Sequence, residues 1–559
     1  MQTRRLGTLS AFVLAAAVFG LHFDARAQSA PVPPPAPVPS SVPPPSPIPL
    51  ETPLGQPSGS PPPGAGPSDT PTQPPIIVDP PSVGVTVGGT QTLHVMQILG
   101  DVVVTVADPT VADATIDQTT RLLTVTGKKI GNTIVTLHDG RGLSRDVSVR
   151  VAYPAGSISD VANVRVTGLP ASPAFLRAEA IEAALARATV RPGANIVATP
   201  ETVVINAPLR VDDITTIAVP LIISGGDQYF TVQGTTHVRI ENFAQPAIRP
   251  KFLLVSDFPE TLKENGILFT AELSAKQSER FLYYHYNPGG QPDRRIVLKA
   301  QNPSSQPALV QLIVGNAGPG VNEMEVGHLA TQRFLVRVAQ NEGTVVTIPP
   351  SATVSLMAQG LPAKTTASGL LQLHEIEGAP LHLTLVAQNA SDPVEGAIPT
   401  SALLVGDRPH ARGIYSIPEF FFDYPYDAEG PELEIPIGQI PLPNLVQGQT
   451  LAGDYGVLQS VTVRMMNNDR HHARDIALYA SPRGGRATGT FVIDRVLVQA
   501  HAMAPFGHYK LRQYTIPPGG YVRTEIVTMP EGGSSYPLRL VVAPDDGSAA
   551  PGSADSPVY

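Results

Sequence analysis

The sequence predicts a mainly β, multidomain protein, in which several β-sandwich modules and one small α+β module follow a proline-rich disordered linker. Three observations predict this class. Short apolar or alternating runs recur roughly every ten residues from residue 76 onward, as in antiparallel sandwiches. Only residues 173–188 have convincing helical spacing, and the densest prolines precede residue 81. A chain of 559 residues has room for several such modules.

The composition excludes several kinds of chemistry. The chain contains no cysteine, which excludes disulfides, thiolate metal sites and cysteine catalysis. Charged residues make up 15% of the chain and hydrophobic residues 42%, so polar uncharged side chains must cover much of the surface.

The first 27 residues have the pattern of a secretory signal peptide. Arg4 and Arg5 precede an apolar stretch over residues 6–21, and Ala25-Arg26-Ala27 has the form of a cleavage site. Cleavage would remove three arginines and one aspartate, so the formal net charge of −9 would become −11. Such an acidic chain has no electrostatic reason to bind nucleic acid, and we expect no membrane span after the signal is removed.

Residues 28–75 are expected to form the disordered linker. Residues 31–80 contain 21 of the 60 prolines, and proline lacks the N–H group that helices and sheet ladders need. Such a segment favours extended polyproline II conformations and would act as a spacer.

Residues 76–153 form the first expected sandwich. Gly127 and Gly131 bracket a Lys-Lys turn, and Asp139-Gly140 is a strong hairpin signal. The segments 106–113 (VADPTVAD) and 122–133 (LLTVTGKKIGNT) resemble the N-terminal domain of bacterial pilus-formation proteins, which is found ahead of secretins, and bacterial Ig-like modules. The resemblance implies an Ig-like fold and a role in pilus machinery, adhesins or surface enzymes. No secretin channel domain follows, and the rest of the chain resembles only generic β-sandwich surface modules.

Residues 158–245 are expected to form the small α+β module. Ser172 can cap the helix, and Pro173 suits its first turn. The spacing predicts that the helix buries small and aliphatic residues against a mixed sheet. These residues are Ala174, Ala178, Ile181, Leu185 and Ala188.

The second half of the chain repeats a pattern. A strand ends in asparagine at Asn302 and again at Asn467, and about 50 residues later Ile-Pro-Pro leads into another strand, at 348–350 and 516–518. We infer two related sandwiches, at residues 250–400 and 456–545. Residues 401–455 would connect them, and residues 546–559 would form a disordered tail.

The densest acidic and aromatic segment covers residues 420–432 (FFFDYPYDAEGPE). Carboxylates beside aromatic rings can form a sugar-binding cleft, a glycosidase acid/base pair or a calcium site, although a solvated connector is the plainer interpretation. The candidate ligand surface consists of Asp423, Tyr424, Tyr426, Asp427, Glu429 and Glu432. The pair His471-His472 lies in a predicted polar turn. We expect no catalytic residue, no cofactor and no metal site.

The sequence therefore predicts an exported, non-enzymatic envelope or surface protein in the periplasm or at the cell surface. It would act in pilus or surface-appendage assembly or in adhesion, with other envelope or pilus proteins as partners and self-assembly as a further option. The alternative is a secreted carbohydrate-active or metal-dependent hydrolase that uses Asp423, Asp427, Glu429 or Glu432. A passive structural layer protein is a third interpretation.

Overall fold

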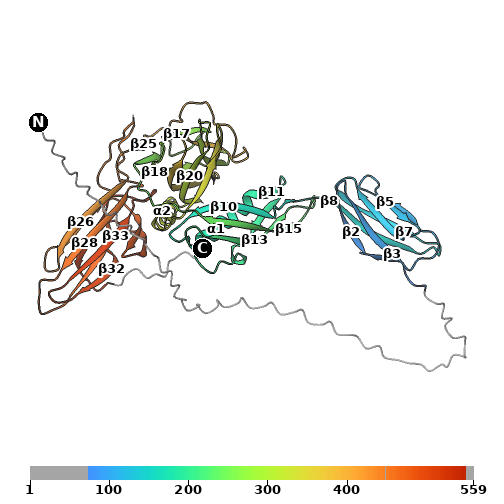
Figure 1. Cartoon of the computed structure of the whole chain (residues 1–559), viewed down its shortest axis with the longest axis horizontal. Coiled ribbons are helices and arrows are strands. Elements are labelled where there is room, and N and C mark those ends of the chain that lie inside the picture. Colours follow the sequence, from blue (N-terminus) through green and yellow to red (C-terminus); the bar gives the residue numbers. More distant parts are fainter. Residues whose placement is uncertain (1–72, 447, 549–559) are drawn as a thin grey trace, which may run out of the picture.

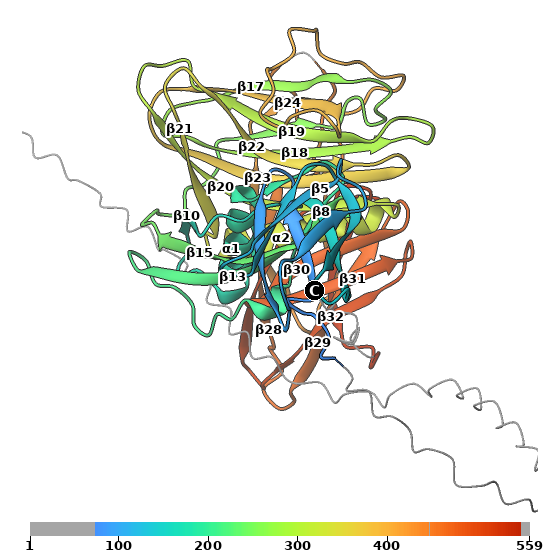
Figure 2. The same ribbon diagram turned by 90° about the vertical axis from the view of Figure 1, so that its right-hand side faces the viewer.

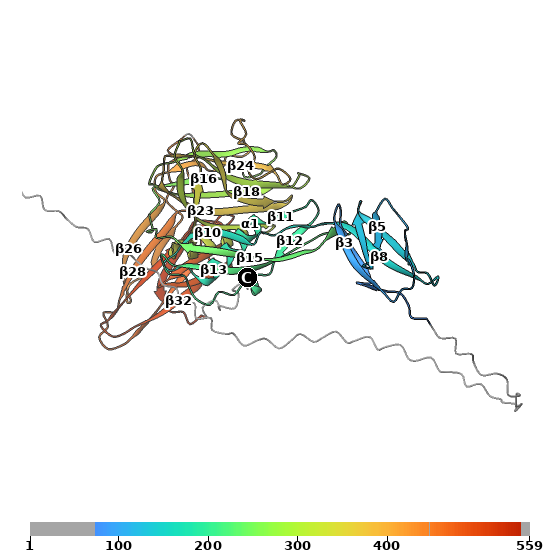
Figure 3. The same ribbon diagram turned by 45° about the vertical axis from the view of Figure 1, so that its right-hand side comes forward.

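The computed structural model describes residues 73–446 and 448–548 (Figure 1). These residues form thirty-four strands, two α-helices and one 3-10 helix, so the mainly β prediction is confirmed. The predicted signal peptide and nearly all of the predicted linker lie outside the described residues, as does most of the predicted tail. Figures 1 and 3 show an N-terminal sandwich at one end of the molecule, a central α+β unit, and two larger β units together at the other end.

The N-terminal unit is a sandwich of two sheets. Its strands alternate between buried and exposed residues, and Leu123 and Val125 of one sheet meet Val135 and Leu137 of the other in a fully buried core. One sheet contains, in spatial order, β1 (Ile77–Asp79), β3 (Thr90–Met96), β6 (Leu122–Gly127) and β5 (Ala112–Asp117). The other contains β2 (Ser82–Thr86), β8 (Ser144–Pro154), β7 (Gly131–His138) and β4 (Val103–Val106).

A short strand from the next unit extends this sandwich. Strand β14 (Tyr229–Phe230) pairs in parallel with the end of β8, on the same side of β8 that β2 occupies further back. Arg150 of β8 donates hydrogen bonds to the carbonyl oxygens of Asp227 and Tyr229, at 3.0 and 2.8 Å. Its guanidinium carbon lies 5.1 Å from the ring centroid of Phe230. The first two units are therefore joined by backbone pairing as well as by side chains.

The central unit is a helix on a sheet. Helix α1 (Pro173–Arg187) begins after Ser172, whose hydroxyl accepts a hydrogen bond from the N–H of Phe175 at 3.3 Å. Ile181, Leu185 and Ala188 pack against the core of this unit as predicted. Ala174 and Ala178 are exposed instead, because the helix turns the larger Phe175 and Leu176 toward the sheet. The sheet strands are β10 (Val161–Thr167), β12 (Asn195–Ala198), β13 (Ile214–Ser224) and β15 (Val232–Asn242), and short strands β9 (Gly156–Ser157) and β11 (Thr189–Val190) pair beside them.

The sheet of the central unit continues into the third unit. Val166 and Thr167 of β10 pair with Thr344 and Gly343 of β21 (Gly343–Ile348), which creates one ten-stranded sheet. A separate four-stranded sheet packs over part of it (Figure 2). The ten-stranded sheet adds β21 (Gly343–Ile348), β20 (Ala308–Gly320), β23 (Thr365–Glu377), β18 (Ser278–Asn287), β16 (Phe252–Ser256) and β25 (Arg412–Tyr415) to the central strands. The covering sheet contains β17 (Gly266–Leu273), β24 (Leu381–Asn389), β19 (Arg294–Gln301) and β22 (Thr353–Leu361).

The third unit contains a helix that the sequence analysis does not predict. Helix α2 (Glu323–Ala339) follows Asn322, whose side chain accepts a hydrogen bond from the N–H of Glu325. It buries Val326, Ala330 and Phe334, which are four residues apart, against β20 and β23. The expectation of a single helix is therefore wrong. The helical spacing is present, but it lies inside a stretch interpreted as a strand-and-turn sandwich.

The C-terminal unit is a second complete sandwich. One sheet contains β26 (Glu419–Asp427), β28 (Leu458–Met466), β33 (Tyr521–Thr528), β30 (Ala487–Ile493) and β31 (Val496–Met503). The other contains β27 (Leu433–Ile437), β34 (Leu538–Pro544), β29 (Arg474–Pro482) and β32 (Tyr509–Ile516). Its core is separate from that of the third unit.

The third unit and the C-terminal sandwich share a pattern of strand pairing. Strand β19 pairs with β22 as β28 pairs with β33, and β20 pairs with β21 and β23 as β29 pairs with β32 and β34. The segments inserted after β20 and after β29 differ, since the first forms α2 and the second forms the hairpin β30–β31. These two insertions pack against each other where the units meet.

Candidate functional site

The acidic and aromatic segment is a strand with a turn after it, and not the loop in a connector that the sequence predicts. Residues 419–427 form β26, the outermost strand of its sheet, which pairs in parallel with β28. The rings of Phe420, Phe422 and Tyr424 stack along one face, with centroids 5.7 and 6.2 Å apart. Tyr426 is buried in the core of the sandwich. Tyr424 and Tyr426, the aromatic residues of the candidate ligand surface, therefore pack against other side chains of the sandwich.

The acids of this segment do not converge on one point. Asp423 pairs with Arg464 at 3.1 Å, and Glu429 pairs with Arg474 at 2.8 Å. Asp427 accepts hydrogen bonds from the side chain of Asn468 and from the N–H of Glu429, while Glu432 is exposed. A carboxylate that already has a cationic partner on an open surface is a poor candidate for catalysis or calcium binding.

The histidine pair lies in the predicted polar turn. His471 and His472 donate their backbone N–H groups to Asp469, and the ring of His472 contacts the same carboxylate at 2.9 Å. These hydrogen bonds, led by the one from the N–H of His471, lower the pKa of Asp469 to about 2. Among the described residues, no group of three or more histidine, aspartate or glutamate side chains is placed to hold a metal ion.

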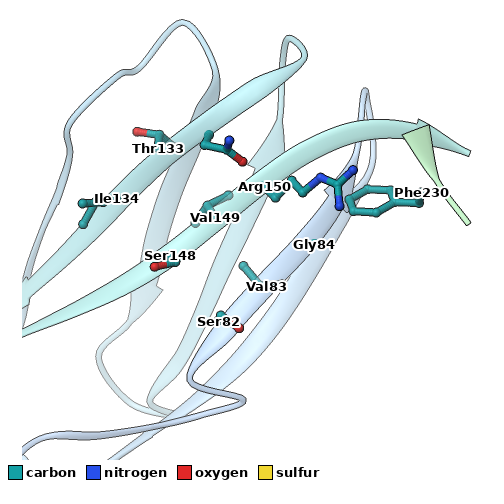
Figure 4. A pocket seen from close by; sticks show the side chains of 10 residues that line it. Ser82, Val83, Gly84, Thr133, Ile134, Ser148, Val149, Arg150 and Phe230 are labelled. Atoms are coloured by element: carbon teal, nitrogen blue, oxygen red, sulfur yellow. The ribbon is translucent and has the colours of Figure 1, made fainter. Parts of the chain in front are cut away.

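A shallow groove crosses the outer face of the N-terminal sandwich (Figure 4). It has a volume of 610 Å³ and runs over strands β2, β8 and β7. Ile134, 44% exposed, lies on one side, and Arg150 with Phe230 closes the other. Phe230 comes from the central unit, so the joint between the two units forms part of the groove. The remaining lining residues are Ser82, Val83, Gly84, Asn132, Thr133, Ser148 and Val149.

A second cleft lies where the third unit meets the C-terminal sandwich, and no sequence motif indicates it. We call it the junction cleft; it has a volume of 460 Å³ and includes Asp257, Glu260, Tyr284, Glu323 and His410. These residues come from four separate segments, which explains why no spacing along the chain connects them. The remaining lining residues are Val255, Leu282, Pro409, Ala411, Gln449, Thr450, Leu451, Ala452, Tyr455, Gly532, Gly533 and Ser534.

His410 lies between two carboxylates of the junction cleft. Its Nδ1 is 3.3 Å from Asp257 and its Nε2 is 3.0 Å from Glu260. The hydrogen bond with Asp257 raises the pKa of His410, while burial raises the pKa of Asp257 to about 6. Because both ring nitrogens face carboxylate oxygens, the arrangement suits a protonated imidazole.

A fully buried ion pair joins α2 to the C-terminal sandwich. His328 Nδ1 lies 3.0 Å from Glu531, and His328 Nε2 lies 3.1 Å from the side-chain oxygen of Gln499. Thr488 and Thr490 donate hydroxyl hydrogen bonds to the same glutamate. Burial opposes ionisation of Glu531, but the charge and hydrogen bond of His328 lower its pKa overall. Burial likewise opposes protonation of His328, but the charge and hydrogen bond of Glu531 raise its pKa overall. This network fixes how the two units meet.

Neither helix in the part of the chain that the structure describes is long and apolar enough to cross a membrane.

Comparison with solved structures finds only partial and distant likenesses. The S-layer protein SbsC is 17% identical over 29% of this chain with a TM-score of 0.14, and the match spans 24% of that protein's chain. The fibronectin(III)-like modules of Clostridium thermocellum CbhA are 12% identical over 30% of this chain and 94% of theirs, with a TM-score of 0.15. The Ig1-2 module of the Drosophila receptor protein tyrosine phosphatase DLAR is 12% identical over 30% of this chain and 100% of its own, with a TM-score of 0.13. Likenesses at this level carry no functional conclusion.

Comparison with protein families finds a match for one region of the chain. No curated protein is significantly similar to the chain. One family does match, and the matched residues form the N-terminal sandwich from the end of β1 into β8, including most of the groove in Figure 4. The predicted resemblance is confirmed: residues 79–152 match the family described as the pilus formation protein N terminal region.

Proposed function

We propose that this chain is an exported, non-enzymatic protein of the cell envelope or surface that acts in the assembly of pili or related appendages through protein–protein contacts. The match of residues 79–152 to the pilus formation protein N terminal region carries the proposal. Its partners would be other envelope or pilus proteins, or further copies of the chain, in the periplasm or at the cell surface. A role in adhesion, instead of appendage assembly, is the alternative for a non-enzymatic surface protein of this kind.

The groove of the N-terminal sandwich is the contact surface that we favour. It lies on the matched region, it is largely apolar, and Ile134 leaves almost half of its surface exposed within it. An apolar side chain exposed in a concave, polar-rimmed surface is typical of protein–protein contacts. The sandwich also stands apart from the two C-terminal units, where a partner can reach it (Figure 1).

The test is a comparison of cells that lack the chain with cells that carry single variants. We expect Ile134→Asp to reduce the number of surface appendages toward that of cells without the chain, because a carboxylate in the groove would have to be desolvated on contact. Ile214→Asp is the matched control, since Ile214 is 52% exposed on a strand of the central unit, outside the matched region. Appendages are counted by negative-stain microscopy, and chain levels are checked by immunoblot. Unchanged appendage numbers in cells without the chain would refute the proposal.

The hydrolase alternative has no observation in its favour. The four acids that it needs are divided among separate ion pairs, hydrogen bonds and open solvent. Glycoside hydrolysis requires two carboxyl groups on opposite sides of one bond.

A further inference from the structure

The sheet that carries the groove (β2, β8, β7 and β4) presents two opposite charges on the outer face of β8. The outward residues of this strand are Asp146, Ser148 and Arg150, which are exposed, whereas Val147 and Val149 between them are buried in the core. Outward residues of a strand follow one another at about 6.5 Å. The acid and the arginine therefore lie at equal distances on either side of Ser148.

Neither charge has an ionic partner within the described part of the chain. Arg150 donates both of its hydrogen bonds to backbone carbonyls through Nη2 alone, so Nε and Nη1 keep three N–H groups for other acceptors. Asp146 accepts a hydrogen bond from the hydroxyl of Thr136 at 2.7 Å, which holds the carboxylate on the outer face. Both charged groups are therefore available to a partner.

An exposed apolar side chain occupies the centre of the same face. Ile134 of β7 lies directly beside Ser148 in the strand register and is 44% exposed. The rows on either side of this one contain the two charges of β8, each beside a neutral residue of β7. The face therefore has an apolar centre with a cation on one side and an anion at the same distance on the other; Figure 4 shows Ile134, Ser148 and Arg150.

This pattern is complementary to itself. A two-fold axis along the row of Ser148 and Ile134 reverses the direction of the strands, so that Asp146 of one protomer faces Arg150 of its partner, and the reverse. It also places the two Ile134 side chains against each other. Contacts related by such an axis use the same surface patch on both subunits, and stacked sheets keep their strands within about 30° of each other. Parallel stacking would instead leave each charge opposite a like charge or a neutral side chain.

The position of the sandwich in the molecule allows this arrangement. Strand β8 leads directly into the central unit, so antiparallel stacking directs the remaining units of the two protomers away from each other (Figures 1 and 3). Strand β7 has eight residues, and four strands of that length cover roughly 500 Å². This area is smaller than the ~800 Å² per partner of a stable complex, so a reversible dimer is expected.

We propose that two copies of this chain pair through the outer faces of their N-terminal sandwiches, with Ile134 at the centre and two Asp146–Arg150 ion pairs around it. The complementary charges, unpaired within the chain, carry this inference. It rests on the function proposed above, in which this face is the contact surface, and it names a second copy as the partner.

Sedimentation velocity of the purified chain from micromolar to submillimolar concentrations tests the dimer. We expect the wild-type chain to pass from monomer to dimer over this range. Asp146→Arg should weaken dimerisation at least roughly tenfold, because each arginine would then face an arginine of the partner. Glu201→Arg is the control, since it makes the same change of charge on the exposed 3-10 helix η1 (Pro200–Thr202) of the central unit. A wild-type chain that stays monomeric, or equal dimerisation of both variants, would overturn the proposal.

An exchange of charges then identifies the paired residues. Arg150→Asp alone should also weaken dimerisation, although Arg150 supports the joint with the central unit as well. An equimolar mixture of Asp146→Arg and Arg150→Asp restores an opposite charge at both positions of the mixed dimer. We expect this mixture to dimerise within roughly threefold of the wild-type affinity. A mixture that stays monomeric would refute the predicted pairing.

The outcome can be separated from that of the proposed function. A monomeric purified chain, together with fewer appendages in Ile134→Asp cells, would mean that the groove binds a different protein, which refutes the dimer alone. Unchanged appendages in cells without the chain, together with rescue in the mixture, would refute the function and leave the dimer in place.

Discussion

Asn302 and Asn467 each hold a turn of their unit through a single side-chain amide. The amide of Asn302 donates to the carbonyls of Gln306, Ile348 and Pro349, and that of Asn467 donates to those of His472, Ile516 and Pro517. The repeated sequence pattern thus corresponds to one repeated set of hydrogen bonds. The asparagine joins the end of one strand to the Ile-Pro-Pro segment that begins the next turn.

Replacing one of these asparagines should destabilise its own unit. Asn467 is 1% exposed, so Asn467→Ala would leave several carbonyl groups without a donor, at a cost of about 2–4 kcal/mol in the free energy of unfolding. The neighbouring Asn468 is exposed and bonds only to Asp427, so Asn468→Ala should change this energy by less than about 0.5 kcal/mol. Chemical denaturation measures both variants. Equal stability of the two would show that the buried amide contributes nothing.

The His328–Glu531 pair should make the joint between the last two units depend on pH. The pKa of His328 is raised from 6.5, so its contribution is complete below about pH 6.5 and is lost as the pH rises through the folded-state value. The pKa of Glu531 is lowered from 4.5, so its contribution is complete above about pH 4.5 and is lost as the pH falls through the folded-state value. Glu325 and His501 also face this site and will modulate the curve.

The pair therefore contributes fully between about pH 4.5 and 6.5. We expect the Tm of the wild-type chain to exceed that of Glu531→Gln by the largest margin in this window, and the margin to shrink on both sides of it. Scanning calorimetry of both proteins across pH 4–9 provides the measurement. A margin that stays constant with pH would contradict the ion pair.

At the scale of elements, α2 approaches the C-terminal sandwich so closely that only glycine fits at the contact. A Cβ atom on Gly327 would lie 1.7 Å from the carbonyl oxygen of Gly532. Gly327→Ala should therefore push the helix away from the sandwich and cost about 1–3 kcal/mol, although alanine is the better helix former by about 1 kcal/mol. Gly360→Ala adds the same methyl group on β22, where nothing lies within 4 Å, and serves as the control in thermal unfolding. A gain in stability for Gly327→Ala would refute the close contact.

The same elements show how far the sequence predicts this fold. The strands of the N-terminal sandwich and helix α1 follow from period-two alternation, turn residues and the Ser172 cap, because these signals act within a few residues. The face that α1 buries, the strand character of residues 419–427 and the insertion of α2 depend on packing against distant segments. The junction cleft combines several such segments, and its residues share no spacing that a sequence pattern could reveal.

At the scale of the whole molecule, backbone pairing joins the units in series. Strand β14 extends β8 of the first unit, and β10 pairs with β21 so that the central and third units share one sheet. The buried ion pair and α2 then join the third unit to the fourth. Each of the three joints is therefore made by strand pairing or by buried side-chain contacts.

The strand pairing at the first joint is only two residues long, and the rigidity of this joint can be tested directly. Strand β14 contributes only two residues to the pairing, and the side chain of Arg150 supplies two further hydrogen bonds and the contact with Phe230. Arg150→Ala should therefore broaden the range of orientations between the first and second units.

Because the chain contains no cysteine, two spin labels can be attached to Thr120→Cys and Glu201→Cys without background. We expect a broader distance distribution between the labels in Arg150→Ala than in the otherwise unchanged chain, and no change in Arg145→Ala, which alters an exposed arginine of the same strand. Identical distributions in all three proteins would mean that the two-residue strand pairing holds the joint without the arginine.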